Sequence, residues 1–347
     1  MNPATLSAMG PFAVVGATGA VGQEFLRILQ ESGAPLDGLR LFASPRSSGK
    51  TVRVGTREVG IEPLQEGCFR GVHMVFFSAG KGVSREWAPR AVRDGAWAID
   101  NSSAFRMDAA VPLVIPEVNG DVLDTCRTPC IVAVPNCSTI VALVATTPLH
   151  REARVRRMVV STYQAVSGAG AAAMRELEQQ ARAYAAGQPL DMSVFGRQCL
   201  FNCFSHNSAV GAEGYNEEEA KLLHESRRIW NDRQLRVTAT CVRVPVLRAH
   251  CESIALEFER PLSESRAREL LAEAAGVEIV DDRIGNRFPE PLSAAGRDPV
   301  LVGRIRPDWS LDAGCGLQLF VAGDQIRIGA ALTGWRIAER LSPVICG

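Results

Sequence analysis

Several features are scarce in this chain of 347 residues, and each scarcity excludes a class of protein. The chain has no net charge, because 38 Lys and Arg residues balance 38 Asp and Glu residues, so it lacks the basic excess of nucleic-acid-binding proteins. Its longest apolar run, Ile140 to Ala145, is far too short to span a bilayer. Hydrophobic residues make up 46% and charged residues 22%, which are globular values and exclude a disordered or fibrous chain.

The chain also has few lysines and shows no sign of an export signal at its start. Lys50, Lys81 and Lys221 are the only lysines among the 38 basic residues. The first residues, Met1 to Gly10, carry no Lys or Arg ahead of their apolar side chains, which argues against a secretory signal. We therefore expect a cytoplasmic protein whose ten cysteines are reduced.

The cysteine spacing does not predict a metal site. No pair of CxxC motifs is present, and the nearest approaches are Cys126 with Cys130 and Cys199 with Cys203. Neither is accompanied by a histidine pair at ligand spacing, so we expect no bound metal.

The pattern of apolar residues changes near Asn136. Before it, short apolar runs alternate with helical stretches, and the predicted strands lie at 12–15, 39–43, 72–77, 96–99 and 131–134. This alternation predicts a parallel, doubly wound sheet. After Asn136 the predicted strands are longer and more β-branched, at 158–166, 235–246, 251–259 and 317–322, and the last helix is predicted at 326–341. This part predicts an α+β domain with a larger antiparallel sheet.

A glycine-rich turn, Gly16-Ala17-Thr18-Gly19-Ala20-Val21-Gly22, joins the first predicted strand to the first predicted helix. Glycines let a pyrophosphate approach the helix N-terminus, where free N–H groups favour anions. Such a turn can be purely structural, but its place at the start of a βαβ unit predicts nucleotide binding. The loop Ser44 to Lys50 then carries Arg46, Ser47 and no acidic residue, which favours NADP over NAD because these groups suit a 2′-phosphate.

Cys137, in Pro135-Asn136-Cys137-Ser138-Thr139, is the candidate nucleophile. It follows a predicted strand, at the edge where α/β sheets bind ligands, and the helix after it is predicted to open at about Ser138. A helix N-terminus lowers the pKa of a thiol and favours the thiolate. A single cysteine is usually structural, so the prediction depends on this position.

Two later segments offer polar groups for the same chemistry. In Tyr163 to Gly170, Gln164 can orient a carbonyl, although the segment is also a common lead-in to a helix. In the segment that ends at His250, Arg243 can bind a carboxylate bidentately and His250 can act as a general acid or base. We interpret the other histidines as structural or surface residues: His73, His150, His206 and His224.

In this order, the motifs resemble those of the aspartate-β-semialdehyde dehydrogenase family. They are GATGAVG, RSSGK, DNSSAFRM, PNCST, STYQAVSGAG, EEAK and RVPVLRAH, with VGRIR and GAALTGWRIAE near the C-terminus. The resemblance covers nearly the whole chain and is poorest at about 192–215 and 309–316.

The resemblance implies an α/β fold with a Rossmann-like NADP-binding domain at 1–136, completed by a C-terminal helix at 324–347. It implies an α+β catalytic and dimerisation domain with a large mixed sheet at 137–323. The implied enzyme is a cytoplasmic homodimer that reduces β-aspartyl phosphate with NADPH to aspartate semialdehyde and phosphate. This step leads toward diaminopimelate, lysine, methionine, threonine and isoleucine, and neither nucleic acid nor membrane is an implied partner.

The site residues implied by the resemblance occupy matching positions. Cys137 matches the nucleophile, His250 the acid/base and Gln164 the residue that orients the acyl intermediate. Substrate-binding positions are matched by Arg243, for the α-carboxylate, and by Glu218, Arg106, Lys221, Asn101, Asn136 and Ser167. Cofactor-binding positions are matched by Gly16, Thr18, Gly19, Ala20, Val21, Ser44, Arg46, Ser47, Ser78, Ala79, Gly80, Gly168 and Gln325.

Some positions depart from the family pattern. Lys81 stands where a second small residue is usual, and Gln325, Ile328 and Thr333 replace an Asn, a Lys and an Asn. Lys81 and Ile328 are closer to a paralogue group without the catalytic cysteine, so a weak or inactive paralogue is one alternative. N-acetyl-γ-glutamyl-phosphate reductase, which performs the same chemistry on a longer, acetylated substrate, is another. Because the catalytic positions are all filled here, we expect an active enzyme.

Overall fold

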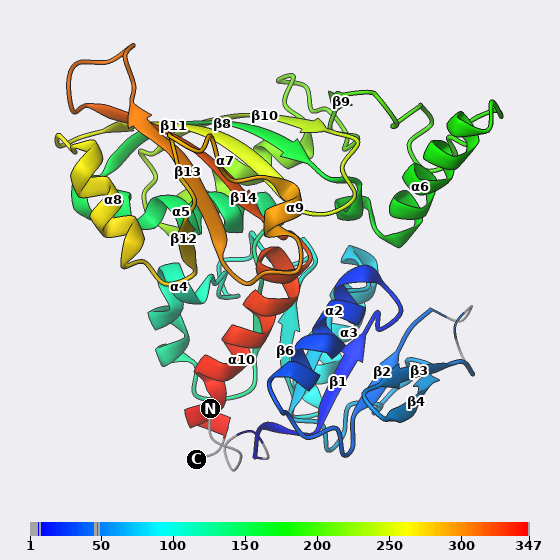
Figure 1. Ribbon diagram of the computed structural model, residues 1–347. Coiled ribbons are helices and arrows are strands. Elements are labelled where there is room, and N and C mark those ends of the chain that lie inside the picture. Colours follow the sequence, from blue (N-terminus) through cyan, green and yellow to red (C-terminus); the bar gives the residue numbers. More distant parts are fainter. Residues whose placement is uncertain (1–5, 7, 45–46, 48, 346–347) are drawn as a thin grey trace. The chain divides into compact units, whose positions relative to one another are not determined.

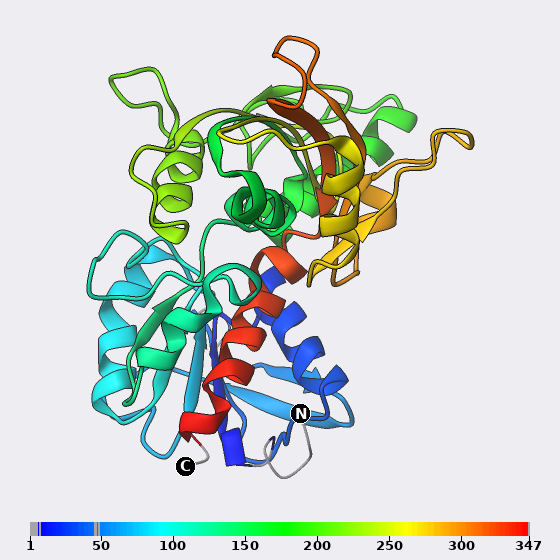
Figure 2. The ribbon, with the colours of Figure 1, turned by 90° about the vertical axis from the view of Figure 1, so that its left-hand side faces the viewer.

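The computed structural model describes residues 6, 8–44, 47 and 49–345, and it divides into two compact units (Figures 1 and 2). The first unit comprises 1–136 and 330–347, and the second comprises 137–329. The C-terminal segment of the first unit thus begins later than the predicted 324. Within the described residues, no helix has the length and apolar character needed to cross a membrane.

The first unit is built on a seven-stranded sheet in the order β3-β4-β2-β1-β5-β6-β7. Its strands are β1 (Phe12–Val15), β2 (Arg40–Phe42), β3 (Thr51–Val54), β4 (Arg57–Glu62), β5 (Met74–Phe77), β6 (Trp97–Asp100) and β7 (Ile131–Ala133). All neighbours are parallel except β3 and β4, so the predicted doubly wound sheet is confirmed. The β3–β4 hairpin was not predicted, because its strands are largely exposed and carry few apolar residues.

Helices of the first unit follow the strands. They are α2 (Ala20–Glu31), α3 (Lys81–Arg93), the short α4 (Pro116–Asn119), the 3-10 turn η2 (Gly120–Thr125) and α10 (Leu332–Ile345). The predicted last helix at 326–341 is wrong at its start, because a π turn, η4 (Arg327–Ala331), precedes α10.

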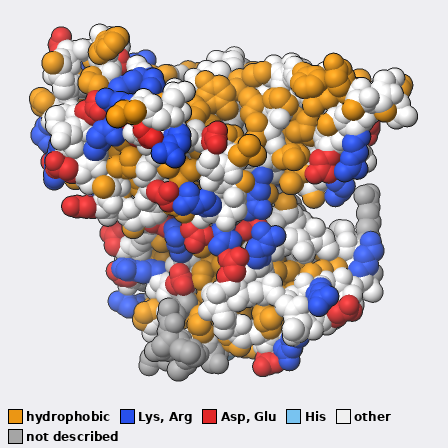
Figure 3. Space-filling view, viewed as in Figure 1, with side chains coloured by type: hydrophobic (Ala, Val, Ile, Leu, Met, Phe, Trp, Pro, Cys, Tyr) orange, Lys and Arg blue, Asp and Glu red, His pale blue; other side chains and the backbone are white. Residues whose placement is uncertain are grey.

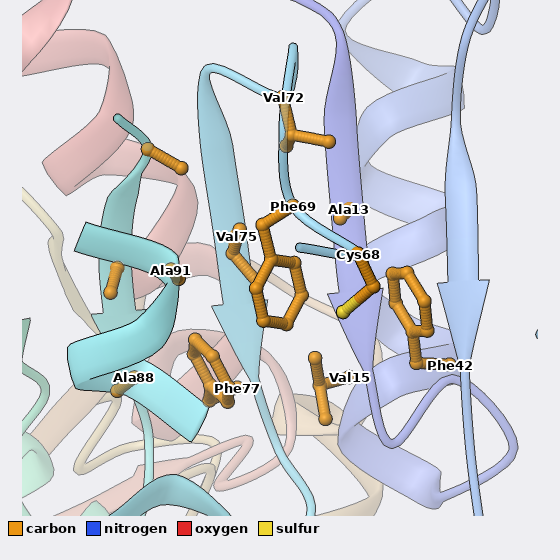
Figure 4. Packing of buried hydrophobic residues seen from close by; sticks show 12 residues of the cluster. Ala13, Val15, Phe42, Cys68, Phe69, Val72, Val75, Phe77, Ala88 and Ala91 are labelled. Atoms are coloured by element: carbon orange, nitrogen blue, oxygen red, sulfur yellow. The ribbon is translucent and has the colours of Figure 1, made fainter. Parts of the chain in front are cut away.

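One apolar cluster fixes the carboxyl ends of β1 and β5 (Figure 4). Phe69 packs edge-on against Phe77 of β5, with ring centroids 6.0 Å apart, and Val15 of β1 lies in the same cluster. Ala88 and Ala91 bring α3 onto this core, since their small side chains allow close approach. The turns that leave β1 and β5 are thereby held in place.

The second unit carries its own seven-stranded sheet, in the order β12-β13-β14-β11-β8-β10-β9. Its strands are β8 (Val155–Gln164), β9 (Phe204–Ser205), β10 (Arg236–Arg243), β11 (His250–Phe258), β12 (Val277–Ile279), β13 (Val300–Pro307) and β14 (Gly316–Gly323). The sheet is mixed, because β8 runs parallel to β10 and β12 parallel to β13. The large mixed sheet that the resemblance implies is therefore confirmed, whereas the antiparallel sheet predicted from the strand pattern was wrong, since alternation of residue types does not report strand direction.

Helices of the second unit are α5 (Cys137–Ala153), the 3-10 turn η3 (Val166–Ala169), α6 (Ala171–Ala185), α7 (Glu217–Ile229), α8 (Glu264–Ala272) and α9 (Pro291–Ala294). Helix α7 begins with a capping box, in which Asn216 and Glu219 satisfy each other's backbone N–H groups. This cap fixes the first turn of α7, where Glu218 lies.

The buried face of β10, β8 and β11 is organised in rows across the strands. His250 precedes Cys251, which pairs with Tyr163, so His250 lies beside Gln164. From the carboxyl end of β8 inward the rows are Arg243–Gln164–His250, Cys241–Thr162–Glu252 and Ala239–Val160–Ile254. The first two rows are polar and the third is apolar.

Candidate active site

The glycine-rich turn after β1 is shaped for close approach. Gly16 has φ +90°, and a Cβ there would lie 2.8 Å from the carbonyl carbon and oxygen of Ser78. A Cβ on Gly22 would lie 2.3 Å from the Gly16 carbonyl oxygen, so neither position accepts a side chain. Helix α2 starts at Ala20 without a side-chain cap. The predicted residues Gly16 to Val21 thus form a turn that ends in a helix N-terminus, which fits a pyrophosphate.

A cavity of about 470 Å³ lies at the same edge of the first sheet. It is lined by Val15, Ala43, Ser44, Pro63, Leu64, Ala79, Val83, Glu86 and Trp87. Apolar walls with a few polar groups fit an adenine ring. Ser44 and Ala79 were predicted here, but Val83 and Trp87 were not, because they share a face of α3 without forming a motif.

Of the remaining predicted cofactor residues, some lie near the glycine-rich turn and the cavity, and others belong to the second unit. The Ser47 N–H donates to the Ser44 carbonyl oxygen at 2.8 Å, and Gly80, at φ +89°, precedes α3. Arg46 lies outside the described residues. Gln325 belongs to the second unit, where its Nε2 donates to Ser167 Oγ and its Oε1 accepts from the Ala249 N–H.

The loop after β6 carries the predicted phosphate-binding residues of the first unit. Asn101 follows the last residue of β6, and its buried Oδ1 has no hydrogen-bond partner within the described part of the chain. Arg106 is buried, and its Nη2 donates to the Asn101 carbonyl oxygen at 2.8 Å. Asn136 is also buried, and it is the last residue of the N-terminal segment of the first unit, directly before Cys137.

Cys137 is the first residue of α5, one residue earlier than predicted, and its neighbour Ser138 is tied to the sheet. Gln164 Nε2 donates to Ser138 Oγ at 2.6 Å and to Glu218 Oε1 at 3.0 Å. Lys221 Nζ lies 3.0 Å from the other Glu218 oxygen, Oε2. Three predicted residues, Gln164, Glu218 and Lys221, therefore share one hydrogen-bonded network with Ser138 at the N-terminus of a helix, where a thiolate is favoured.

Gly329, the first residue of the GAALTGWRIAE motif, packs against the candidate nucleophile. A Cβ added to Gly329 would lie 2.9 Å from Cys137 Cβ. The motif was quoted for its resemblance, but sequence reasoning did not predict this contact, because Gly329 is distant from Cys137 along the chain and lies in a π turn.

Arg243 is almost fully buried beside the network. Its Nη1 donates to the Ala165 carbonyl oxygen at 2.7 Å, and its Nη2 lies 2.8 Å from His206 Nε2. The buried Nε has no partner within the described residues, which leaves this edge of the guanidinium able to take a carboxylate. Burial lowers the pKa of Arg243, and the charges of Glu218 and Cys137 act in the opposite direction.

His206 was interpreted as structural or surface from the sequence, and its place beside Arg243 is a correction. It follows β9, a strand too short to show in the sequence pattern. Burial lowers the pKa of His206 to about 4, so the ring is neutral and its Nε2 accepts from Arg243 while Nδ1 faces Ser208 Oγ at 3.0 Å.

His250 is buried, and the orientation of its ring is fixed. The Ala165 N–H donates to Nδ1 at 3.0 Å. Burial, and then the charge of Arg243, lower the pKa of His250 to about 3. Gly168, matched to the cofactor by resemblance, lies against the same groups: a Cβ there would lie 3.3 Å from His250 Nε2 and 3.2 Å from Arg243 Nη1. Across the described ranges, no group of three acidic, histidine or cysteine residues could hold a metal ion.

The two buried histidines predict how stability depends on pH. Both are neutral in the folded protein, but an unfolded histidine takes up a proton below about pH 6.5. The free energy of unfolding is therefore expected to fall from pH 6.5 to about 4, by up to about 1.4 kcal/mol per pH unit for each histidine. Urea denaturation across this range checks this: His250→Gln should reduce the slope, and His224→Gln, on the exposed face of α7, should not. An unchanged slope in His250→Gln contradicts the assignment.

Comparisons with known proteins agree with this geometry. Residues 12–126 match the model for "Semialdehyde dehydrogenase, NAD binding domain", and residues 147–328 match "Semialdehyde dehydrogenase, dimerisation domain". An aspartate-semialdehyde dehydrogenase of Aquifex aeolicus is 46% identical over 331 residues, which cover 95% of this chain and 97% of that protein. The crystal structure of Vibrio cholerae aspartate semialdehyde dehydrogenase II complexed with ASA has TM-score 0.91 and 40% identity, covering 95% and 97% of the two chains. The Candida albicans enzyme, solved with NADP, has TM-score 0.73 and 25% identity, covering 96% and 99%.

Proposed function

Because this chain belongs to the aspartate-semialdehyde dehydrogenase family, we propose that it reduces β-aspartyl phosphate to aspartate semialdehyde with NADPH, through an acyl-thioester on Cys137. The observation that carries the proposal is the network in which Gln164 links Ser138, the neighbour of Cys137, to Glu218. Through Ser138 the network reaches the candidate nucleophile. It also contains the amide of Gln164, which can orient the acyl group, and the carboxylate of Glu218, which can hold an ammonium group.

The first step needs Cys137 as a thiolate, which the N-terminus of α5 and the charge of Arg243 favour. The thiolate sulfur attacks the acyl carbon, the S–C bond forms and the C–O bond to phosphate breaks. Phosphate leaves with the electron pair. Lys221, Arg106 and Asn101 supply the cationic and amide groups that suit a phosphate.

Arg243 and Glu218 bind the unreactive end of the substrate. The buried Nε of Arg243, which has no hydrogen-bond partner within the described residues, suits the α-carboxylate, and Glu218 suits the α-ammonium group. An acetylated amine would gain no charge pairing at Glu218, which is why the aminated substrate is favoured over the acetylated one of the reductase alternative.

The Gly16 turn and the cavity beside Ser44 and Ala79 would hold NADPH, which would supply the hydride for reduction of the thioester carbonyl. The chain's own groups then stabilise the negative charge on the carbonyl oxygen, and collapse of this oxyanion expels the Cys137 thiolate. The cycle begins and ends with a thiolate, and the one proton that the reaction consumes ends on phosphate.

Homodimer formation is part of the proposal, and the outer face of the second sheet supports it. Tyr163, 40% exposed, and the partly buried Phe320 lie together on this face, with ring centroids 6.1 Å apart. Figure 3 shows hydrophobic side chains gathered over the second unit. This is also the unit that matches the family's dimerisation domain.

The test is a phosphate-dependent dehydrogenase assay with aspartate semialdehyde and either NADP⁺ or NAD⁺, followed by absorbance of the reduced nicotinamide. We expect turnover that requires phosphate and is faster with NADP⁺. N-acetylglutamate semialdehyde serves as the comparison substrate, and faster turnover with it would replace the proposed substrate. Absence of turnover with both substrates, from folded protein, would favour the inactive paralogue.

A further inference from the structure

A buried carboxyl group that the proposed mechanism does not use lies directly beneath the site. Glu252 has no exposed surface, and within the described residues neither of its carboxyl oxygens has a hydrogen-bond partner. It stands in the second row of the sheet, beside Thr162 and one row below Gln164. The next row is apolar, so folding of this core does not require a polar group at the Glu252 position.

Glu252 interacts electrostatically with Glu218, and the two carboxyl groups have different surroundings. Glu218 has Lys221 Nζ at 3.0 Å and Gln164 Nε2 at 3.0 Å, and both favour its charged form. Glu252 has no such partner, and burial, followed by the charge of Glu218, raises its pKa well above the usual range. Two nearby carboxyl groups compete for a proton, and here the proton belongs on Glu252.

Other ionisable groups face the row from the elements packed around it. They are His250 on β11, Cys241 and Arg243 on β10, Cys137 on α5, and Glu219 and Lys221 on α7. Burial keeps His250 neutral and raises the pKa of the Cys241 thiol, and Lys221 is paired with Glu218. Arg243 is the remaining cation, and its Nη1 and Nη2 contact the Ala165 carbonyl oxygen and His206 Nε2. Within the described residues, none of these groups is hydrogen-bonded to the Glu252 carboxyl group.

We propose that Glu252 is a positioning residue: it remains a neutral carboxylic acid beneath the site and confines the negative charge of the pair to Glu218, where the substrate ammonium group binds. The part that concerns the substrate rests on the proposed function, whereas the protonation of Glu252 does not. A neutral polar head group at the Glu252 position also gives the Glu218 carboxylate a polar group, rather than an apolar side chain, in its surroundings, and polar surroundings favour the charged form.

Infrared spectroscopy of the protein without substrate tests the protonation. We expect a protonated-carboxyl C=O band at neutral pH that disappears in Glu252→Gln. In Glu218→Gln the band should titrate at lower pH, because the repelling charge is gone, while Glu225→Gln, a change to another buried acid of α7, leaves the band of Glu252 in place. A neutral-pH spectrum in which Glu252→Gln removes no such band overturns the proposal, whether or not the enzyme turns over.

Kinetics with aspartate semialdehyde test the positioning role. Glu252→Gln, which keeps shape and neutrality, should leave KM within about twofold, whereas Glu218→Gln should raise KM about tenfold or more. Glu252→Met, which removes the polar head group, should raise KM about tenfold and change kcat less. If Glu252→Met has the wild-type KM, Glu252 has only a structural role. If Glu252→Gln has a raised KM, substrate binding requires a charged carboxylate at this position. Either result contradicts the proposal. Lack of wild-type turnover counts against the proposed function alone, because the infrared experiment still decides the protonation of Glu252.

Discussion

Replacing Cys137 with alanine is expected to lower phosphate-dependent reduction of NADP⁺ by about 10⁴-fold or more, because no acyl-thioester can form without the sulfur. The substitution removes the sulfur from the first residue of α5 and adds no atom near Gly329, which packs against the Cβ of Cys137. The fold and NADP⁺ binding should therefore be retained. The initial rate with saturating aspartate semialdehyde, phosphate and NADP⁺ measures the loss.

The matched control is Cys203→Ala, at an exposed cysteine of the same unit. It should keep wild-type activity, which separates loss of the nucleophile from general effects of removing a thiol. Cys137→Ser is a second comparison, since a hydroxyl at this position has a pKa too high to form the anion at neutral pH. Turnover by Cys137→Ala near the wild-type rate would exclude Cys137 as the nucleophile.

The first row of the site was predictable because each of its members follows a local rule. Gln164 and Arg243 lie near the ends of predicted strands, and His250 directly precedes the next one. In the structure they end β8 and β10 and begin β11, so a single sheet edge collects residues that are far apart in the sequence. Cys137 could be placed for the same reason, at the junction of a strand and a helix. The parallel sheet of the first unit was predictable because its strands alternate with helices.

The features that escaped prediction depend on pairing between distant segments. Glu252 is one of two acids in β11, and only the register with Thr162 places it one row below Gln164. His206 contacts Arg243 because a two-residue strand pairs with β10. Gly329 is one glycine of many until the backbone brings it against Cys137. The strand pattern could not predict strand direction in the second sheet for the same reason, since direction is set by pairing and not by the pattern of residue types.

The hydrogen bond at His250 also narrows the chemistry available to that residue. Because the Ala165 N–H donates to Nδ1, the neutral ring carries its proton on Nε2. A ring in this state donates from Nε2 and cannot take a thiol proton there. The proposed cycle needs no such base, since it begins and ends with the Cys137 thiolate. We therefore expect His250 to act as a neutral hydrogen-bond donor to the oxyanion, a role known for neutral imidazole elsewhere.

Two substitutions distinguish a donor from a base. His250→Ala removes the donor and is expected to lower kcat by about 10²–10³-fold, the usual cost of one oxyanion-stabilising group. His250→Gln carries an N–H at about the position of Nε2 and is expected to recover much of this loss, to within about tenfold of the wild type. His224→Gln, on the exposed face of α7, should change neither kcat nor KM. If glutamine and alanine are equally inactive, proton acceptance by the ring is required and the donor role fails.

The protonation state can be observed without turnover. With the pKa of His250 lowered to about 3, its ring should show the ¹⁵N chemical shifts of the neutral Nε2–H tautomer from pH 5 to 8. The acid limb of the kcat/KM profile should then belong to another group, and it should persist unchanged in His250→Gln. A ring that protonates near its ordinary pKa of about 6.5 would show that the buried Nδ1 contact does not hold in solution. His250 would then be available as the acid or base that its position in the sequence first suggested.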